Sequence, residues 1–236
     1  MPYFHRDSWR SKLHPLALPL ALATACLLSG CSGVKVRPDA KLPHAMVQPL
    51  AVRAGLVLEQ ELRTYVHVES RGGNDYAVDL GAGHEHLFKD VLGASIANLQ
   101  VFNNVDAARA GTGMQALFVP HIEQFSFATA NETSGGYWAV TIRYRISVLS
   151  PQGEPVDTLT LTGYGSAQNA GMSAASMTAA TQSAMRDAAA KLLVQLPRQP
   201  LTQKLIAGQS LSAADASSIV VDVIEQVPIL PVAQGR

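Results

Sequence analysis

The chain has 236 residues, with 18 basic and 18 acidic side chains, 47% hydrophobic residues, 15% charged residues and two cysteines. This length fits one globular domain with a sizeable core plus some non-globular sequence. The few cysteines argue against a disulfide scaffold, the neutral charge balance against a strongly basic nucleic-acid binder, and the low charge content against a highly charged disordered chain.

The amino terminus has the layout of a secretory signal. Three basic residues and one acidic residue lie within residues 1–14, and an apolar run follows over 15–28. The run is shorter than the roughly 20 residues of a membrane-spanning helix, and Pro19 would disturb one. We therefore predict that residues 1–30 are a signal peptide that is removed. A short transmembrane anchor is the alternative.

Directly after the apolar run stands Leu28-Ser29-Gly30-Cys31, which resembles the lipobox of bacterial lipoproteins. In that family the cysteine thiol receives a diacylglyceryl thioether and the chain is cut before it. The resemblance implies that Cys31 is lipidated and begins the mature chain. Each buried methylene contributes about 0.8 kcal/mol, so one acyl chain anchors only marginally whereas two or three hold stably.

The remaining cysteine and the next residue extend this interpretation. Cys26 lies in the segment to be removed, which leaves Cys31 as the only thiol. Residue 32 is serine, whereas aspartate there commonly retains lipoproteins at the inner membrane of two-membrane bacteria. The resemblance thus implies the outer membrane, with the chain facing the periplasm. Removal of residues 1–30 takes away three basic residues and one acidic residue, so the mature chain has 15 basic and 17 acidic residues. This balance gives no electrostatic reason to bind nucleic acid or anionic lipid.

The mature chain divides into three parts. Residues 31–50 contain glycine and prolines without a sustained period, which predicts a lipidated tether. Residues 51–200 are predicted to form the folded periplasmic domain, and residues 201–236 a weakly ordered carboxyl-terminal tail. Within that tail, the apolar group at 218–230 is an edge strand, a docking peptide or a partly ordered end.

The first half of the domain mixes strands with one helix. Apolar residues at spacings of three and four predict a helix from Gly81 to about Asn98, whose broad apolar face needs a sheet to cover it. The segment 59–63 is ambiguous between extended chain and a helical turn. Short apolar or alternating runs predict strands over 54–58, 65–69 and 76–80, and an extended piece at 101–105.

The second half has the clearest pattern. Within Tyr137 to Leu149 every even-numbered residue is apolar and the residues at 141, 143, 145 and 147 are polar, which predicts a strand with one buried and one wet face. Strands are also expected over 117–127 and 156–164, the latter after a hairpin turn at 150–154. An alanine-rich helix from Met172 to Leu196 is thin enough to lie close against a sheet, and Pro197 ends it.

Together these elements predict an α+β fold of two layers, with a mostly antiparallel sheet and two helices packed on one face. Four short segments lie within the run from 55 to 196: 61–65 (ELRTY), 79–81 (DLG), 101–102 (VF) and 163–165 (GYG). Through these segments the run resembles proteobacterial envelope lipoproteins without assigned activity. More loosely, its layout alone is similar to the amino-terminal domain of TolB, to the curli-secretion lipoprotein and to the lipoprotein activators of penicillin-binding proteins.

The sequence offers few residues for chemistry. His84 and His86 are two apart, so on a regular helix they point about 200° from each other, whereas zinc-binding pairs sit at i and i+4. The Gly81-Ala82-Gly83 segment lacks the third glycine of a dinucleotide loop, because His86 occupies that position. Ser166 and Ser173 show no local sign of activation by a base. We predict no catalytic residue, no metal and no cofactor.

A binding surface is the remaining candidate. Arg143 and Arg145 lie two apart, on the same face of a strand, and Trp138 stands beside a loop at 129–136. The two arginines could hold an anionic headgroup, a glycan or the carboxylates of a partner. The alternative is an ordinary solvated strand face.

Three functions follow from these observations. The first is a non-enzymatic outer-membrane lipoprotein, held by lipid on Cys31, that docks an envelope protein partner in assembly, secretion or wall maintenance. The second is an auxiliary lipid-binding or small-molecule-binding subunit of an envelope transporter, with a cavity lined by Trp138, Ile142 or Met185. The third is a periplasmic hydrolase, which requires His84, His86, His121 and Glu123 to share one cleft.

Overall fold

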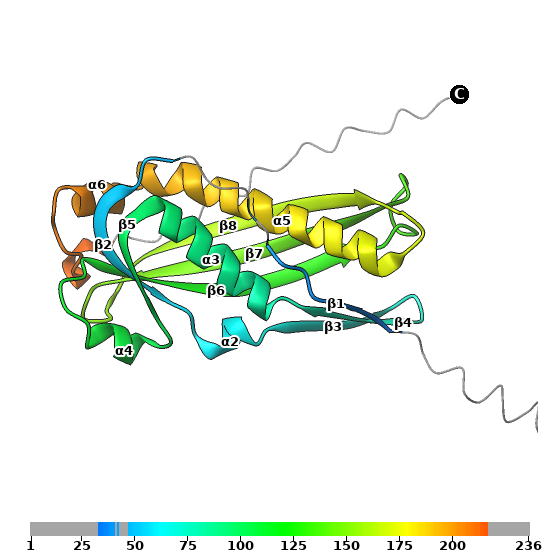
Figure 1. Cartoon of the computed structure of the whole chain (residues 1–236), viewed down its shortest axis with the longest axis horizontal. Coiled ribbons are helices and arrows are strands. Elements are labelled where there is room, and N and C mark those ends of the chain that lie inside the picture. Colours follow the sequence, from blue (N-terminus) through cyan, green and yellow to red (C-terminus); the bar gives the residue numbers. More distant parts are fainter. Residues whose placement is uncertain (1–32, 41, 43–46, 217–236) are drawn as a thin grey trace, which may run out of the picture.

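The computed structural model describes residues 33–40, 42 and 47–216. Its main sheet has five strands in the order β5-β2-β6-β7-β8 (Figure 1). β2 runs parallel to both its neighbours, and β6, β7 and β8 are antiparallel. The strands are β2 (Leu50–Val57), β5 (Ile96–Phe102), β6 (Ala116–Ala128), β7 (Tyr137–Leu149) and β8 (Pro155–Gln168).

A second, three-stranded sheet lies at one end of the molecule. Its order is β1-β4-β3, with β1 parallel and β3 antiparallel to β4. The strands are β1 (Val34–Val36), β3 (Val66–Arg71) and β4 (Asn74–Asp79). The sequence predicted one sheet, and the separation into two follows from the chain's route: β3 and β4 form a hairpin whose partner is the amino-terminal segment.

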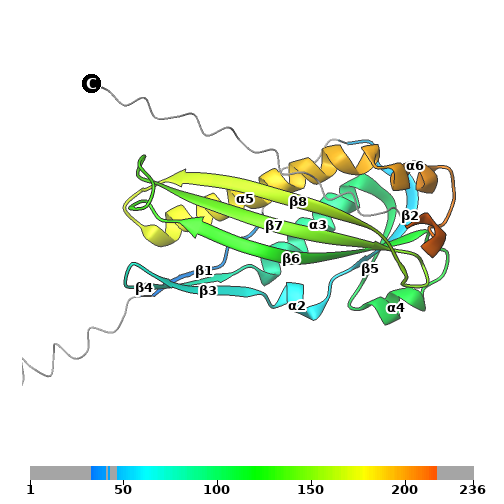
Figure 2. The same ribbon diagram turned by 180° about the vertical axis from the view of Figure 1, so that it is seen from behind.

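Two long helices lie side by side on one face of the main sheet (Figures 1 and 2). They are α3 (Gly81–Ser95) and α5 (Ser173–Gln195). The predicted α+β class, with its mostly antiparallel strands and both helices on one face, is therefore confirmed. Shorter helices are α2 (Gln60–Arg63), α4 (Val105–Arg109), α6 (Pro200–Ile206) and the 3-10 turns Leu196–Arg198 and Ala213–Asp215.

The alternating side chains of β7 determine what is buried between the main sheet and the two long helices. Its even-numbered residues turn toward the helices, and Ile142, Tyr144 and Ile146 are fully buried. Burying such a side chain contributes about 1.5–3 kcal/mol. The predicted bounds of this strand, Tyr137 to Leu149, are the observed ones.

α5 packs on β8 with almost no side chain between the two backbones. A Cβ atom on Gly163 would lie 2.1 Å from the carbonyl oxygen of Ala184, and one on Gly165 would lie 2.1 Å from that of Ala180. Both alanines are fully buried, and they stand four residues apart on one side of the helix. The thin helix expected from the alanine content is confirmed, and its close approach requires the two glycines.

The same helix covers part of the free edge of β8. The amide of Tyr164 donates to Oδ2 of Asp187 at 2.8 Å, and Nζ of Lys191 donates to the carbonyl of Thr162 at 2.7 Å. Asp187 and Lys191 also pair with each other at 2.7 Å. These side chains occupy backbone groups that another strand could otherwise use.

The glycine pair at the start of α3 also serves close packing. A Cβ on Gly81 would lie 1.9 Å from the carbonyl oxygen of Arg63, and one on Gly83 would lie 2.6 Å from that of Pro38. Ala82 between them is exposed. The amide of Gly81 donates to Asp79, which also accepts from Arg37 at 2.8 Å. The segment therefore joins α3 to α2 and to the chain after β1.

The folded body extends beyond the predicted range 51–200 at both ends. The expected tether contains β1, and Val36 and Ala40 are buried in the core. The expected tail contains α6, with Leu205 and Leu211 buried in the same core. Short apolar groups flanked by polar residues show no period of their own, so their burial depends on partners distant in sequence. Residues 218–230 lie outside the described part.

Three local predictions also differ from the structure. The first long helix ends at Ser95 rather than near Asn98, because Ile96 is extended and pairs with Leu50 of β2. Val105 begins helix α4 instead of continuing an extended piece, since Asn104 caps that helix by accepting from the amide of Ala107 at 2.7 Å. The ambiguous segment at 59–63 forms α2.

Candidate functional site

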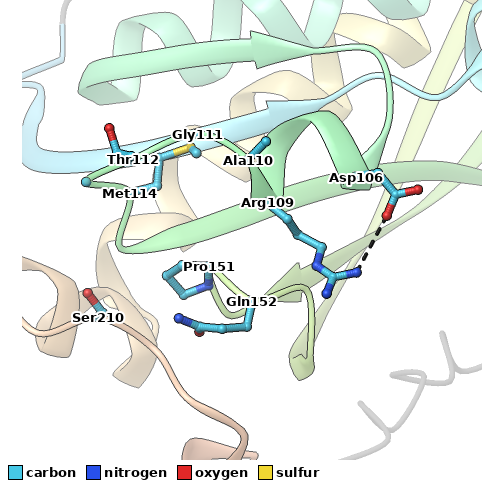
Figure 3. Close-up of a pocket in the computed structure, with 10 residues that line it drawn as sticks. Asp106, Arg109, Ala110, Gly111, Thr112, Met114, Pro151, Gln152 and Ser210 are labelled. Carbon is cyan, nitrogen blue, oxygen red and sulfur yellow. Dashed lines mark ion pairs between the residues drawn. The ribbon is translucent and has the colours of Figure 1, made fainter.

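α4 and the β7–β8 turn lie at the end of the molecule opposite the small sheet (Figure 1), and they help to line an open cleft of about 590 Å³ (Figure 3). Three segments that are far apart in sequence enclose it. They are α4 with the following loop to Met114, the β7–β8 turn at Pro151 and Gln152, and the segment at Ser210.

The polar side chains of the cleft are free to meet a ligand. Nη1 of Arg109 lies 3.5 Å from Oδ1 of Asp106, and 54% and 92% of these side chains are exposed. An ion pair this long and this exposed is weak, so the guanidinium can accept another anion. Gln152 and Ser210, which are also exposed, add an amide and a hydroxyl. The cleft is therefore suited to a polar segment that carries a carboxylate.

Beneath these side chains the cleft has a fixed floor. Met114 is buried in a small apolar cluster with Val57, Leu117 and Leu149, on the face of the main sheet that the long helices do not cover. Nε2 of Gln115 donates to the carbonyls of Leu205 and Gln209 at 2.9 and 3.1 Å. These contacts fix the segment that carries Ser210 relative to β6.

Sequence analysis missed this cleft. Its lining comes from positions 106–114, 151–152 and 210, and none of them belongs to a recognisable motif. The local signals were Gly111 and Gly113 in one loop and the Pro-Gln-Gly turn. Neither signal says that the two segments lie together.

The predicted binding surface is only partly assembled. Arg145 is exposed and pairs through Nε with Oε1 of Glu123 at 2.9 Å. Arg143 lies two residues earlier on the same outer face, half-buried. Trp138 does not join them: it is 3% exposed on the inner face, stacked on Phe127 and near Tyr76 of the small sheet. Its inclusion was wrong because the small sheet covers that end of β7.

His84 and His86 diverge, as the helical geometry predicts. His86 lies at the surface and pairs with Asp39 at 2.9 Å. His84 is fully buried, its ring centroid lies 5.3 Å from that of Tyr144, and neither of its ring nitrogens has a hydrogen-bond partner among the described residues. Burial lowers its pKa to about 4. The Tyr144 hydroxyl is also buried without a partner, and burial raises its pKa.

The residues of the hydrolase hypothesis do not meet in one cleft. His84 lies on α3 and packs against Tyr144 on the inner face of the sheet, whereas His121 lies near Glu59 at 3.9 Å and Glu123 pairs with Arg145 on the outer side. Ser166 and Ser173 are exposed, and neither hydroxyl bonds to a histidine or carboxylate within the described ranges. Across those ranges no three histidine, cysteine or acidic side chains are grouped to hold a metal.

The space between helices and sheet is filled. The contact of Phe88 and Tyr144 with Leu161 and Leu192 leaves no room for a water molecule. Ile142 and Met185, two of the side chains expected to line a ligand cavity, are fully buried in the core. At these positions the described helices and sheet leave no internal cavity of the kind that a carrier function would require.

The lipobox residues Leu28, Ser29, Gly30 and Cys31 lie outside the described residues. From Gly33 to Ala216, apart from the undescribed positions, no helix is long and apolar enough to cross a membrane.

Comparison with known proteins gives distant structural neighbours. No protein-family model matches the chain, and no curated protein matches its sequence. A DUF330-family protein from Xanthomonas campestris is similar over 75% of this chain and 96% of its own, with 13% identity and a TM-score of 0.46. A Caulobacter crescentus protein described provisionally as a lipoprotein is similar over 53% and 82%, with 12% identity and a TM-score of 0.35. At these values neither neighbour assigns a function to this chain.

Proposed function

We propose that the protein is a lipoprotein of the outer membrane, lipidated at Cys31, whose periplasmic body docks another envelope protein. One observation carries the proposal: Leu28-Ser29-Gly30-Cys31 follows an apolar run and stands immediately before a folded body. Two or three acyl chains would hold such a body stably at a membrane.

A non-enzymatic role is part of the proposal. The histidines and the serines considered for catalysis lie on different faces of the fold, and none of these serines has a base beside it in the described part of the chain. The filled interior also gives no support to a carrier that encloses its ligand. A subunit that contacts a transporter from outside is compatible with docking.

The cleft is the proposed docking site. It is concave and it combines a weakly paired guanidinium with an amide, a hydroxyl and a buried apolar floor. A polar segment of a partner with an aspartate or glutamate would pair with Arg109. Charge-assisted bonds of this kind contribute about 1.5–3 kcal/mol when they are shielded from water.

Cross-linking in cells tests the docking site. A photoreactive residue at Gln152 should capture a partner in the native envelope, and Arg109→Gln should reduce that capture severalfold. Arg186→Gln is the matched control, because Arg186 is an exposed arginine of α5 that does not line the cleft. Equal capture in both variants, or no captured protein, would contradict docking through the cleft.

A further inference from the structure

The lipidation site lies too close to the folded body to be joined to it by a flexible tether. β1 begins at Val34, which pairs with Tyr76 of β4, and Gly33 lies beside Asp75 at the same end of the small sheet. Only Ser32 separates Gly33 from Cys31. Because successive Cα atoms are 3.8 Å apart, the Cα of Cys31 lies within about 8 Å of that of Gly33, whatever conformation the link adopts.

Three loops meet at this end of the molecule (Figures 1 and 2). They are the β3–β4 turn at Gly72 and Gly73, the β6–β7 loop at 129–136, and the β8–α5 segment at 169–172. Nη1 of Arg71, just before the first loop, donates to the carbonyl of Phe127 at 2.6 Å and lies 3.4 Å from Oε2 of Glu132 in the second loop. The amide of Asn169 donates to the carbonyl of Gly136 at 3.2 Å, which joins the second to the third.

The surface of this end is weakly charged and partly apolar. Lys35 of β1 and Arg71 at the end of β3 are the cations at these segments, and Asp75 near the start of β4 and Glu132 in the 129–136 loop are the anions. Arg71 and Glu132 pair with each other. Met172 is 67% exposed and Tyr137 is 39% exposed. An apolar side chain and an amphipathic aromatic one suit the headgroup layer of a membrane, and the balanced charges do not oppose it.

The cleft lies at the other end of the strands. β7 runs from Tyr137, beside the 129–136 loop, to Leu149, just before the Pro151-Gln152 turn that lines the cleft. Thirteen residues of strand at about 3.3 Å per residue place the two ends about 40 Å apart.

We propose that the end formed by Gly33 and the three loops rests on the phospholipid headgroups of the leaflet that holds Cys31. Met172 and Tyr137 lie in the headgroup layer. The strands of the main sheet stand away from the membrane, and the cleft opens about 40 Å from the lipid surface. This orientation rests on the proposed lipidation of Cys31. It means that the partner reaches the cleft from the periplasm rather than from the bilayer.

Fluorescence quenching in vesicles tests the orientation. The full-length protein, purified with its lipid, is reconstituted in phosphatidylethanolamine–phosphatidylglycerol vesicles that contain a headgroup-region lipid quencher. Single variants Met172→Cys, Thr160→Cys and Gln152→Cys carry the fluorophore; Thr160 is exposed on the outer sheet face, in the middle of β8. The label at 172 should lose most of its emission, and the labels at 160 and 152 should keep theirs.

The other outcomes separate two kinds of failure. Quenching at all three positions would mean that the sheet lies flat on the membrane, and quenching at 152 alone would mean the reverse orientation; either overturns the inference. The mass of each sample is measured first. A mass without diacylglyceryl, or a fluorophore attached at Cys31 itself, would contradict the proposed function rather than the orientation.

Discussion

The inner face of the main sheet is packed so closely that the backbone of α5 contacts the backbone of β8. In contrast, the outer face and the cleft present polar groups to water. Gly163 and Gly165 have no room for a methyl group on the inner side. Farther along the outer side, away from the buried cluster around Met114, Arg143 is half-buried and Arg145 and Thr160 are exposed on neighbouring strands. The difference separates two roles: changes on the inner face should alter folding, and changes at these outer positions should leave stability almost unchanged.

The largest effect is expected where backbone meets backbone. Gly165→Ala would place a methyl group 2.1 Å from the carbonyl oxygen of Ala180 and 2.3 Å from the amide nitrogen of Ala184. The helix must then move off the strand, so the free energy of unfolding should fall by about 3 kcal/mol or more. Urea denaturation measures this loss.

Gly93→Ala is the matched control for that substitution. Gly93 lies in α3, and a Cβ there would meet no atom within 4 Å. Alanine is about 1 kcal/mol better than glycine inside a helix, so this variant should be more stable than the wild type. Equal losses in both variants would contradict the packing account.

The next effect depends on pH. The pKa of His84 is lowered from 6.5 to about 4 by burial, so the unfolded chain binds a proton between these values and the folded chain does not. The contribution of neutral His84 to the free energy of unfolding is fully present above pH 6.5 and is lost as the pH falls toward 4. Between pH 7 and pH 4 this linkage amounts to about 3 kcal/mol.

His84→Leu should remove that part of the pH dependence. Denaturant titrations of both proteins at several pH values give the change in unfolding free energy with pH for each protein. The carboxylates contribute equally to both, so the difference between the two proteins reports on His84. Parallel curves for the wild type and the variant would show that folding does not lower the pKa of His84 and would contradict this prediction.

A smaller effect is expected at the edge of β8. Asp187→Ala removes the acceptor of the Tyr164 amide and the partner of Lys191. Loss of one hydrogen bond and a half-exposed ion pair should cost about 1 kcal/mol. Asp90→Ala is the control, because Asp90 is exposed on α3, and its loss should stay within about 0.5 kcal/mol. A cost at Asp187 no larger than at Asp90 would show that the edge contacts do not matter.

The smallest effect belongs to the outer face. Arg145→Ala breaks the pair with Glu123, in which 46% and 34% of the two side chains are exposed. Such pairs contribute about 0–1 kcal/mol, so thermal unfolding should barely change. A loss of unfolding free energy above about 2 kcal/mol would show that the outer face stabilises the fold as the inner face does, and it would contradict the distinction between the two faces.

The sequence predicts those elements whose burial follows a local period. In β7 the buried and less buried residues alternate as far as Val148, and α5 was expected within one residue of its observed start and end. β1 has three residues and is a strand because it pairs with β4, so no local pattern in the sequence predicted it. Trp138 shows the same limit, because its cover comes from Tyr76 in the other sheet.

The candidate site was harder to predict than the fold. Local geometry was enough to reject a metal site at His84 and His86, since their directions follow from helical spacing. The cleft could not be found in this way. Arg109, Gln152 and Ser210 come together only because two turns and a carboxyl-terminal segment meet at one end of the sheet.

Mass spectrometry of the protein isolated from its native envelope tests the central claim most directly. The account predicts a chain that begins at Cys31, with a diacylglyceryl group in thioether linkage to that sulfur. A chain that still carries residues 1–30, or one that begins at Cys31 with an unmodified thiol, would contradict it.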